Sequence, residues 1–112
     1  MSDVDIPSRP TVTVARGNLY LARELCDAYF PGTNSVALLE REGCLLIVPL
    51  IAESSGGLLL KVRNARGDRM LHAQEFFRAR GYVEDDEERN CPVLWRAEVA
   101  ALEIMGIFAT KM

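Results

Sequence analysis

The sequence predicts a mainly β fold with two short helices, in which two copies of one motif interlock about a pseudo-twofold axis. The first observation behind this prediction is that Ala-Arg-Gly-Asn at residues 15–18 recurs as Ala-Arg-Gly-Asp at 65–68. The second is that each tetrapeptide follows a β-rich stretch and precedes a short helical pattern. The third is that an apolar, hairpin-like segment comes next in each copy, at 35–50 and 92–104. Such internal similarity indicates a repeat architecture.

The first copy, residues 11–52, is defined by its alternation and its turn residues. β-branched residues alternate before Gly17, which favours a strand, and Gly17 and Asn18 tolerate the positive φ of a turn or bulge. A helical pattern follows and is stopped by Pro31. The expected elements are a strand at 11–16, a turn at 17–18, an extended segment at 19–21, a helix at 22–29 and a hairpin with strands at 35–40 and 44–50.

The second copy, residues 58–106, repeats this order with changes. Residues 53–57, rich in serine and glycine, read as the linker between the copies. Gly81 is placed to cap a helix in the left-handed conformation. One extra residue is expected before this helix, and an insertion at 84–90 after it. The expected elements are a strand at 58–64, a turn at Gly67-Asp68, a helix at about 71–80 and a hairpin with strands at 92–96 and 99–104.

Neither half is expected to fold alone. Each offers about three short strands and one small helix, too little apolar area to offset the chain entropy. We therefore expect residues 11–106 to form a single domain, a six-stranded barrel with both helices packed on it. A closed barrel also leaves no exposed strand edge. Residues 1–10 are expected to be a flexible arm, and 106–112 a short tail.

Composition places the chain among ordinary folded domains. It has 112 residues, with 49% hydrophobic and 26% charged, enough to bury a core without disulfides. The longest apolar stretch, 44–52, is too short to span a bilayer, and residues 1–10 resemble no targeting peptide, so we expect a cytoplasmic protein. An odd number of cysteines without a C-x-x-C pair fits a reducing compartment, and each is expected to be a small core side chain: Cys26, Cys44 and Cys91.

Charge is distributed unevenly along the chain. The net charge of −3 argues against an indiscriminate polyanion binder. Residues 61–80 nevertheless carry six Lys or Arg against only Asp68 and Glu75, and residues 84–88 are all acidic. Two interpretations stay open: a solvated basic face followed by a solvated acidic loop, or a basic contact surface with an acidic flap beside it.

Two stretches carry a family resemblance. Residues 14–25 and 35–49 resemble the AbrB/SpoVT swapped-hairpin repeat, which reads as strand, glycine turn, strand, short helix and a hairpin ending near a proline. Residues 62–104 resemble a second, more divergent copy, and two copies in one chain is the MraZ-like arrangement. The resemblance implies a cradle-loop β-barrel.

The same resemblance implies a DNA-binding transcription factor or the antitoxin of a toxin pair. In such proteins a basic residue after the turn glycine contacts phosphate or a base edge; here Asn18 and Asp68 follow Gly17 and Gly67, which we expect to form the structural turns. The remaining basic residues near the turns are the candidate DNA contacts: Arg16, Arg23, Lys61, Arg63, Arg66 and Arg69.

An enzyme finds little support in the sequence. His72 is the only histidine, so no His-rich metal site is available. The chain has neither of the glycine-rich phosphate-binding motifs, and residues 84–88 lack the ligand spacing of a calcium loop. Trp95, in an alternating strand, is expected in the core. We therefore predict a non-enzymatic protein without cofactor or metal.

Two functional hypotheses remain. The first is a DNA-binding regulator or antitoxin in which each copy presents one turn to a groove, and a homodimer would read a longer site. The second is a protein-interaction or assembly module on the same barrel that does not bind nucleic acid. An acidic pI of about 5.1, Asp68 at the second turn and the acidic loop 84–88, which suits a basic partner, favour the second.

Overall fold

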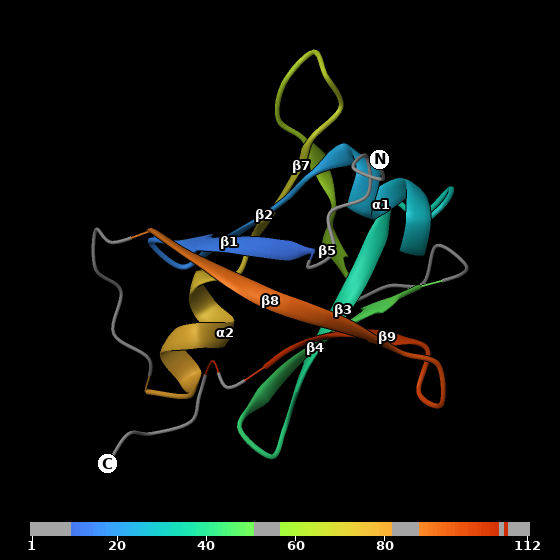
Figure 1. The fold of residues 1–112 in the computed structure, drawn as a ribbon. Coiled ribbons are helices and arrows are strands. Elements are labelled where there is room, and N and C mark those ends of the chain that lie inside the picture. Colours follow the sequence, from blue (N-terminus) through green and yellow to red (C-terminus); the bar gives the residue numbers. More distant parts are fainter. Residues whose placement is uncertain (1–9, 51–56, 82–87, 106, 108–112) are drawn as a thin grey trace, which may run out of the picture.

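The protein is mainly β with two short helices, as predicted. The computed structural model describes residues 10–50, 57–81, 88–105 and 107. Strands account for 51% of the residues that the structure describes, and nine antiparallel strands form one sheet that curves into a nearly closed barrel (Figure 1). The predicted number of six strands is therefore wrong. No helix in the described ranges is long and apolar enough to cross a membrane.

The elements follow the same order in the two halves of the chain. The first half contributes β1 (Thr11–Ala15), β2 (Asn18–Leu21), α1 (Arg23–Tyr29), β3 (Ser35–Arg41) and β4 (Cys44–Pro49). The second half contributes β5 (Leu58–Leu59), β6 (Lys61–Val62), β7 (Arg69–His72), α2 (Gln74–Ala79), β8 (Glu88–Arg96) and β9 (Ala101–Ile104).

The strand order shows that the two halves interlock. Across the sheet it is β5-β3-β4-β9-β8-β1-β2-β7-β6. Within the first half β1 pairs with β2, within the second half β6 pairs with β7, and the last two strands of each half form a hairpin. The first strand of each half also pairs with the hairpin of the other half, in the pairs β1–β8 and β3–β5. Finally, β2 pairs with β7 and β4 with β9, so equivalent strands meet on a pseudo-twofold axis.

A single short segment closes the barrel. β5 and β6 stand at opposite ends of the strand order, yet only Leu60 separates them in the chain. The Leu60 backbone N–H donates to the Asn34 carbonyl at 2.9 Å, which extends the pairing with the first half. Residues 58–62 therefore touch both ends of the sheet, and this closure protects edges that would otherwise be open to other chains.

The two β-turns before the helices differ in length, which the repeated tetrapeptide does not reveal. In the first half Arg16 and Gly17 form the turn with φ of 51° and 79°, as in a two-residue hairpin turn, and Asn18 already belongs to β2. The predicted turn at 17–18 is thus one residue too late. In the second half the strand ends at Val62 instead of residue 64, and a six-residue loop, 63–68, precedes β7.

The second helix begins later than predicted. Residues 71–72, expected to start the helix, belong to β7, because Leu71 lies opposite Leu19 and both are fully buried. The cross-strand pairing outweighs the local helical pattern. The extra length of the second copy lies in the loop before β7, not directly before the helix. Gly81 has a φ of 77°, the left-handed conformation predicted for it.

The second hairpin is longer than predicted. β8 begins at Glu88 because residues 88–92 pair with β1. Residues 88–90 are therefore strand, not part of an insertion. The rest of that expected insertion, 84–87, lies outside the described residues, as do the arm 1–9 and almost all of the expected linker and tail.

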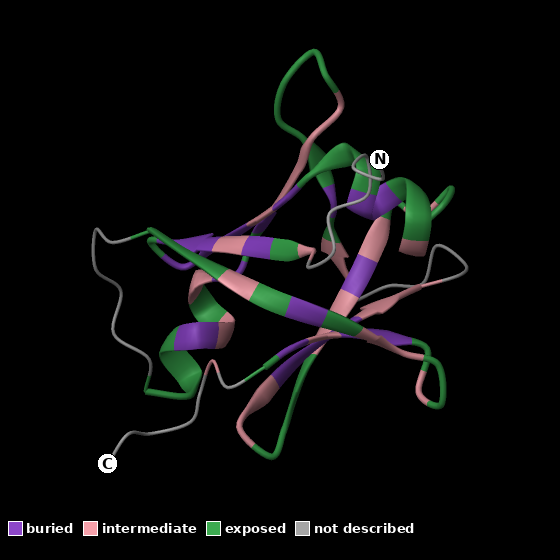
Figure 2. Cartoon of the chain, viewed as in Figure 1, coloured by how far each residue is buried: buried purple, intermediate pink, exposed green. Residues whose placement is uncertain are grey.

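One hydrophobic cluster fills the barrel and takes side chains from both halves (Figure 2). Leu19 and Leu71 meet on the axis, and the helices insert Leu25, Cys26 and Phe77. Trp95, expected in the core, is half-buried and packs against this cluster. Its ring stacks on Tyr29 at 5.2 Å between centroids, which ties α1 to β8.

Candidate nucleic-acid interface

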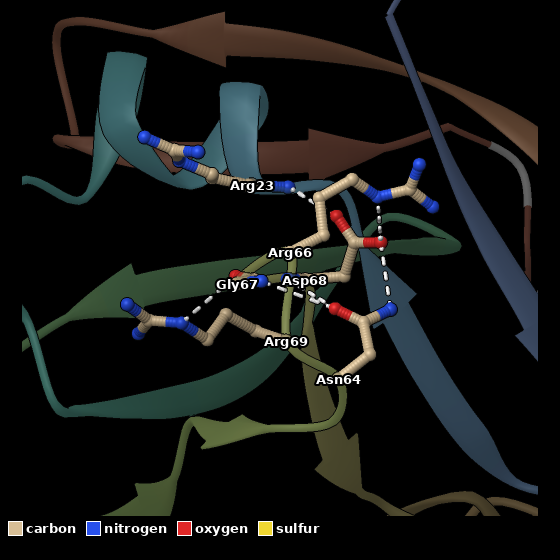
Figure 3. A network of polar contacts seen from close by, with 6 residues as sticks. All are labelled: Arg23, Asn64, Arg66, Gly67, Asp68 and Arg69. Carbon is tan, nitrogen blue, oxygen red and sulfur yellow. Dashed lines mark hydrogen bonds and ion pairs between the residues drawn. The ribbon is translucent and has the colours of Figure 1, made fainter.

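Loop 63–68 is organised around the carboxylate of Asp68 (Figure 3). Asp68 Oδ1 accepts a hydrogen bond from the backbone N–H of Arg23 at 2.9 Å. Asp68 Oδ2 accepts one from Asn64 Nδ2, also at 2.9 Å, and lies 3.4 Å from Arg66 Nε. One side chain therefore joins the loop of the second half to the helix of the first.

Asn64 closes the loop from the other side. Its Oδ1 accepts from the backbone N–H groups of Gly67 at 3.1 Å and Asp68 at 3.0 Å. Gly67 has a φ of 97°, and a Cβ there would lie 3.2 Å from Arg23 Cδ, so glycine suits the position for both reasons. The predicted role of Gly67 as a structural turn residue matches this geometry, although the turn is longer than expected.

The contacts of Asp68 also fix its ionisation. Hydrogen bonds from Asn64 and from the Arg23 backbone, with the positive charge of Arg66, lower the pKa of Asp68 below its ordinary value of 3.8. The carboxylate is thus ionised at neutral pH and already committed to three groups. Asp68 at the second turn is a structural anion whose acceptors face the protein, not a free negative charge facing a ligand.

The start of α1 depends on this contact. Ala22, at the helix N-cap, has no side chain that can accept a hydrogen bond from the first turn. The four N-terminal N–H groups of a helix need acceptors. Asp68 supplies one from the opposite half of the chain, which explains an aspartate at a place where the family resemblance leads one to expect a basic residue.

Three of the candidate basic residues project from the loop and from β6. Among the candidate arginines that form ion pairs, Arg66 is the more exposed, with 72% of its side chain accessible, against 57% for Arg23. The Arg63 guanidinium lies over the Tyr20 ring at 4.6 Å from the centroid. Lys61 is exposed on β6, two residues before Arg63. We call the segment that carries these three exposed cations, residues 61–68, the basic loop.

Two further candidates lie at the base of this loop. The Arg69 Nε donates to the Gly67 carbonyl at 3.2 Å, and Arg69 is half-buried. Arg23, at the first position of α1, forms an exposed ion pair with Asp27 at 3.4 Å. The structure thus brings together five of the six predicted contact residues, and the two at the base help to hold the loop in place.

Arg16 lies elsewhere, at the start of the other helix. The Gly17 carbonyl accepts from the Ala73 backbone N–H at 3.0 Å, and the Arg16 carbonyl accepts from Gln74 Nε2 at 3.3 Å. The first turn therefore meets the start of α2, as the basic loop meets the start of α1. The β2–β7 pair, with Asn18 opposite His72 and Leu21 opposite Arg69, separates these two sites.

Tyr20 is a member of the site that the sequence reasoning missed. It lies on β2 and carries Arg63 on its ring, so it positions one of the basic side chains. The Asn18 Nδ2 donates to the Tyr20 hydroxyl at 3.4 Å, while the buried Asn18 Oδ1 has no hydrogen-bond partner within the described part of the chain. The available signal was the alternation of β2, which places Tyr20 and Asn18 on the face opposite Leu19 and Leu21.

The described residues also include one histidine and three cysteines. His72 is exposed and lines an open pocket of about 420 Å³ with Glu75 and Phe76. Burial raises the pKa of the Cys26 thiol to about 11 and raises that of Cys91, so these two cysteines are poor nucleophiles at neutral pH. Within the described ranges no three His, Cys, Asp or Glu side chains gather in a way that could hold a metal ion.

Comparison with known proteins finds no match: no protein-family model, no curated protein and no solved structure corresponds to this chain.

Proposed function

We propose that this protein binds double-stranded DNA through the basic loop, as an AbrB/MraZ-like transcriptional regulator or antitoxin. The observation that carries the proposal is that three exposed basic residues, Lys61, Arg63 and Arg66, lie on β6 and on the adjoining loop 63–68, whose shape is fixed by Asp68 and Asn64. Cations on an ordered loop lose little conformational freedom when they meet phosphates. The order of elements in each half supports the resemblance to the swapped-hairpin repeat.

The ion pairs within the loop do not prevent such contacts. Arg66 is paired with Asp68 through Nε at 3.4 Å while most of its side chain is exposed. An exposed pair of this kind contributes little to stability, because solvent screens the two charges. Its terminal guanidinium nitrogens can still donate to a phosphate oxygen, because arginine carries five donors.

The negative net charge of the whole chain does not represent the charge at the basic loop. The net charge of −3 includes residues 84–87, which lie outside the described residues. At the loop itself, five basic residues stand against Asp68 and Asp27, both of which hold partners from the same cluster. The local field is positive, and this attracts a polyanion.

Arg16 supplies a second, separate contact in this proposal. It stands at the far end of the four-residue strand β2 from the basic loop. Four residues of strand span about 10–14 Å. That separation is close to the major-groove width of about 12 Å, so the two turns suit neighbouring phosphate rows on one duplex.

Fluorescence anisotropy with a labelled random-sequence duplex tests the proposal. Between 50 and 200 mM salt we expect log K to fall with a slope of about −3.6 against log salt, because each of the four proposed contacts (Lys61, Arg63, Arg66 and Arg16) adds about −0.9. Arg63→Ala and Arg66→Ala should each reduce the slope by about one unit. Arg78→Ala is the matched control, since α2 lies far from the basic loop in Figure 1. Absence of binding at 50 mM salt, or equal effects of Arg66→Ala and Arg78→Ala, contradicts the proposal.

The second candidate function is an interaction module on the same barrel that does not bind nucleic acid. The observation that favours it is a group of half-exposed leucines on the outer face of the sheet, Leu39 at 51% and Leu94 at 46% accessibility. Loss of DNA binding in the salt experiment would leave this candidate standing.

A further inference from the structure

Four neighbouring strands carry a row of three leucines and one glutamate on the face opposite the barrel interior. In antiparallel sheets, residues directly opposite each other share a face. Leu39 on β3 is opposite Leu46 on β4, Leu46 is opposite Glu103 on β9, and Glu103 is opposite Leu94 on β8. We call the surface formed by these four residues and Met105 the outer leucine face.

The two ends of this row are exposed to solvent. Leu39 and Leu94 are 51% and 46% exposed, and Met105, which follows β9, is 46% exposed. Leu46 is only 4% exposed, but it does not belong to the cluster that fills the barrel. Leu46 and the ion-paired Glu103 therefore form the covered middle of the row, and the half-exposed Leu39, Leu94 and Met105 stand around it.

The charges on this face are nearly neutralised within the chain. Arg96 Nε lies 3.0 Å from Glu103 Oε1 and 3.8 Å from Glu98 Oε2. Glu103 retains only 12% side-chain accessibility. Because acidic and basic groups alternate here, the face does not suit a polyanion such as DNA, and it suits a partner that has the same mixture of charges.

The two exposed leucines are equivalent under the pseudo-twofold relation. Leu39 is opposite Leu46 in the first hairpin, Leu94 is opposite Glu103 in the second, and Leu46 and Glu103 meet between the hairpins. A half-turn about an axis perpendicular to the sheet thus exchanges Leu39 with Leu94, and also Arg41 with Arg96. The face looks similar after this rotation, although the two hairpins have different sequences.

We propose that a second copy of this chain docks on the outer leucine face and forms a symmetric homodimer. The dimer axis runs parallel to β4 and β9 in the interface, so that Leu39 of each copy packs against Leu94 of the other. In a twofold-symmetric dimer each contact occurs twice: if one residue packs against a second residue of the other copy, the second residue packs against the first one there as well. Here each exposed leucine meets a leucine, which satisfies that condition.

The alternative docking direction is less favourable. With the axis perpendicular to the strands, Leu39 would meet its own counterpart and Glu103 would face Glu103 of the second copy. Like charges directly opposite each other disfavour pairing. With the axis parallel to the strands, Glu103 faces Leu46 of the second copy and keeps its ion pair with Arg96.

The size of the face sets the expected strength. Three half-exposed apolar side chains with their neighbours make a patch of a few hundred Å², below the roughly 800 Å² that each partner buries in a standard interface. We therefore expect a dimer with a dissociation constant in the micromolar range. The proposal does not depend on the proposed DNA binding.

Sedimentation equilibrium of the whole chain, without DNA, tests the proposal. Between about 1 and 300 μM, the weight-average mass should rise from 12.5 kDa towards twice that value. Leu39→Glu and Leu94→Glu should each weaken dimerisation by about a hundredfold or more. Val62→Glu is the control, because Val62 is 61% exposed on β6, away from this face.

A double variant tests which residues meet. Leu39→Glu combined with Leu94→Lys should restore dimers, because each glutamate then faces a lysine of the other copy. Leu39→Glu combined with Leu94→Glu should stay monomeric. Within one chain these two positions are three strands apart, about 14 Å, so an internal ion pair cannot explain the rescue. Circular dichroism confirms that each variant is folded.

A wild-type mass of 12.5 kDa at every concentration overturns the proposal. Dimerisation that survives Leu39→Glu and Leu94→Glu but is lost in Val62→Glu overturns it equally. Failure of the charge rescue, with both single variants monomeric, rejects the proposed axis. A negative result for DNA binding leaves all of these outcomes unchanged, so the two proposals fail separately.

Discussion

At the scale of single residues, Asp68 connects more of this molecule than any neighbour in its loop. Its carboxylate holds Asn64 and Arg66 from its own loop and the start of α1 from the other half. A family comparison alone would treat an acidic residue here as a loss of DNA contact. The geometry gives it a different role, because Asp68 orders the loop that carries the basic side chains.

The lowered pKa of Asp68 predicts a pH-dependent contribution to stability. Since the pKa is below 3.8 in the folded protein, the unfolded chain binds a proton at a higher pH than the folded one does. The contribution is present above pH 3.8 and is lost as the pH falls through the lower, folded value. Asp68→Asn should therefore reduce the urea midpoint at pH 7, and this difference from wild type should shrink as the pH falls from 5 to 2.

Asp27→Asn is the matched control for that experiment. Asp27 also pairs with Arg23, but through an exposed contact at 3.4 Å. Exposed pairs of this kind contribute little. A difference between Asp68→Asn and wild type that is the same at every pH would contradict the assigned role of the carboxylate.

At the scale of elements, α1 is a seven-residue helix that cannot be stable by itself. It is held by buried Leu25 and Cys26 on one face and by an aromatic contact at its end. Tyr29 stacks on Trp95 with an interplanar angle of 13°, and Phe30 meets the same ring edge-on at 6.5 Å. The helix of the first half is thus fixed to a strand of the second.

This contact can be measured by a double-mutant cycle. Trp95→Ala should destabilise the fold by about 2–4 kcal/mol, because a large half-buried ring is removed. Tyr29→Ala should cost less, and the coupling between the two should be about 1 kcal/mol. Chemical denaturation of the four proteins gives the value. Leu94→Ala on the same strand is the control, and its coupling to Tyr29→Ala should be near zero, since Leu94 points to the outer face.

At the scale of the whole molecule, the two halves share every layer of the barrel. Each first strand pairs with the hairpin of the other half, and one cluster of buried side chains crosses the axis. Half a chain would therefore expose both its unpaired strands and its share of the core. Stability belongs to the interlocked pair.

This interlocking predicts one cooperative transition. Leu19→Ala in the first half and Leu102→Ala in the second each remove a fully buried side chain, and each should destabilise by about 2–5 kcal/mol. Fluorescence of the only tryptophan, Trp95, and far-ultraviolet circular dichroism should shift together in both variants at a fixed protein concentration. Separate midpoints for the two probes, or a Leu19→Ala variant in which only circular dichroism shifts, would show that the halves fold independently.

Much of this organisation was predictable from local signals. The helix α1, the β3–β4 hairpin and the left-handed Gly81 follow from periodicity and turn residues, and the structure confirms them within one residue at each boundary. Residues 71–72 were misassigned because a short apolar stretch can belong to a strand or to a helix. The length of loop 63–68 was missed because matching letters at 65–68 concealed a different register.

In the candidate site, too, some features were predictable from local sequence signals and others were not. Clustered arginines at 63–69 were visible in the sequence, and five of the six chosen residues gather at one loop. That Arg16 stands at the other end of β2 depends on the pairing of β2 with β7. Tyr20 enters the site only because Arg63 folds back over its ring, a contact between positions 43 residues apart that has no local signature.

The sequence alone determined the element types, the order of elements in each half and the repeated design, because alternation, periodicity and turn preferences act between near neighbours in the chain. The tertiary structure decided which strands pair across the halves, that residues 58–62 close the barrel and which leucines stand outside it. These features depend on contacts between residues far apart in the chain. Such contacts are selected by the burial of the whole core, and short sequence patterns do not contain that information.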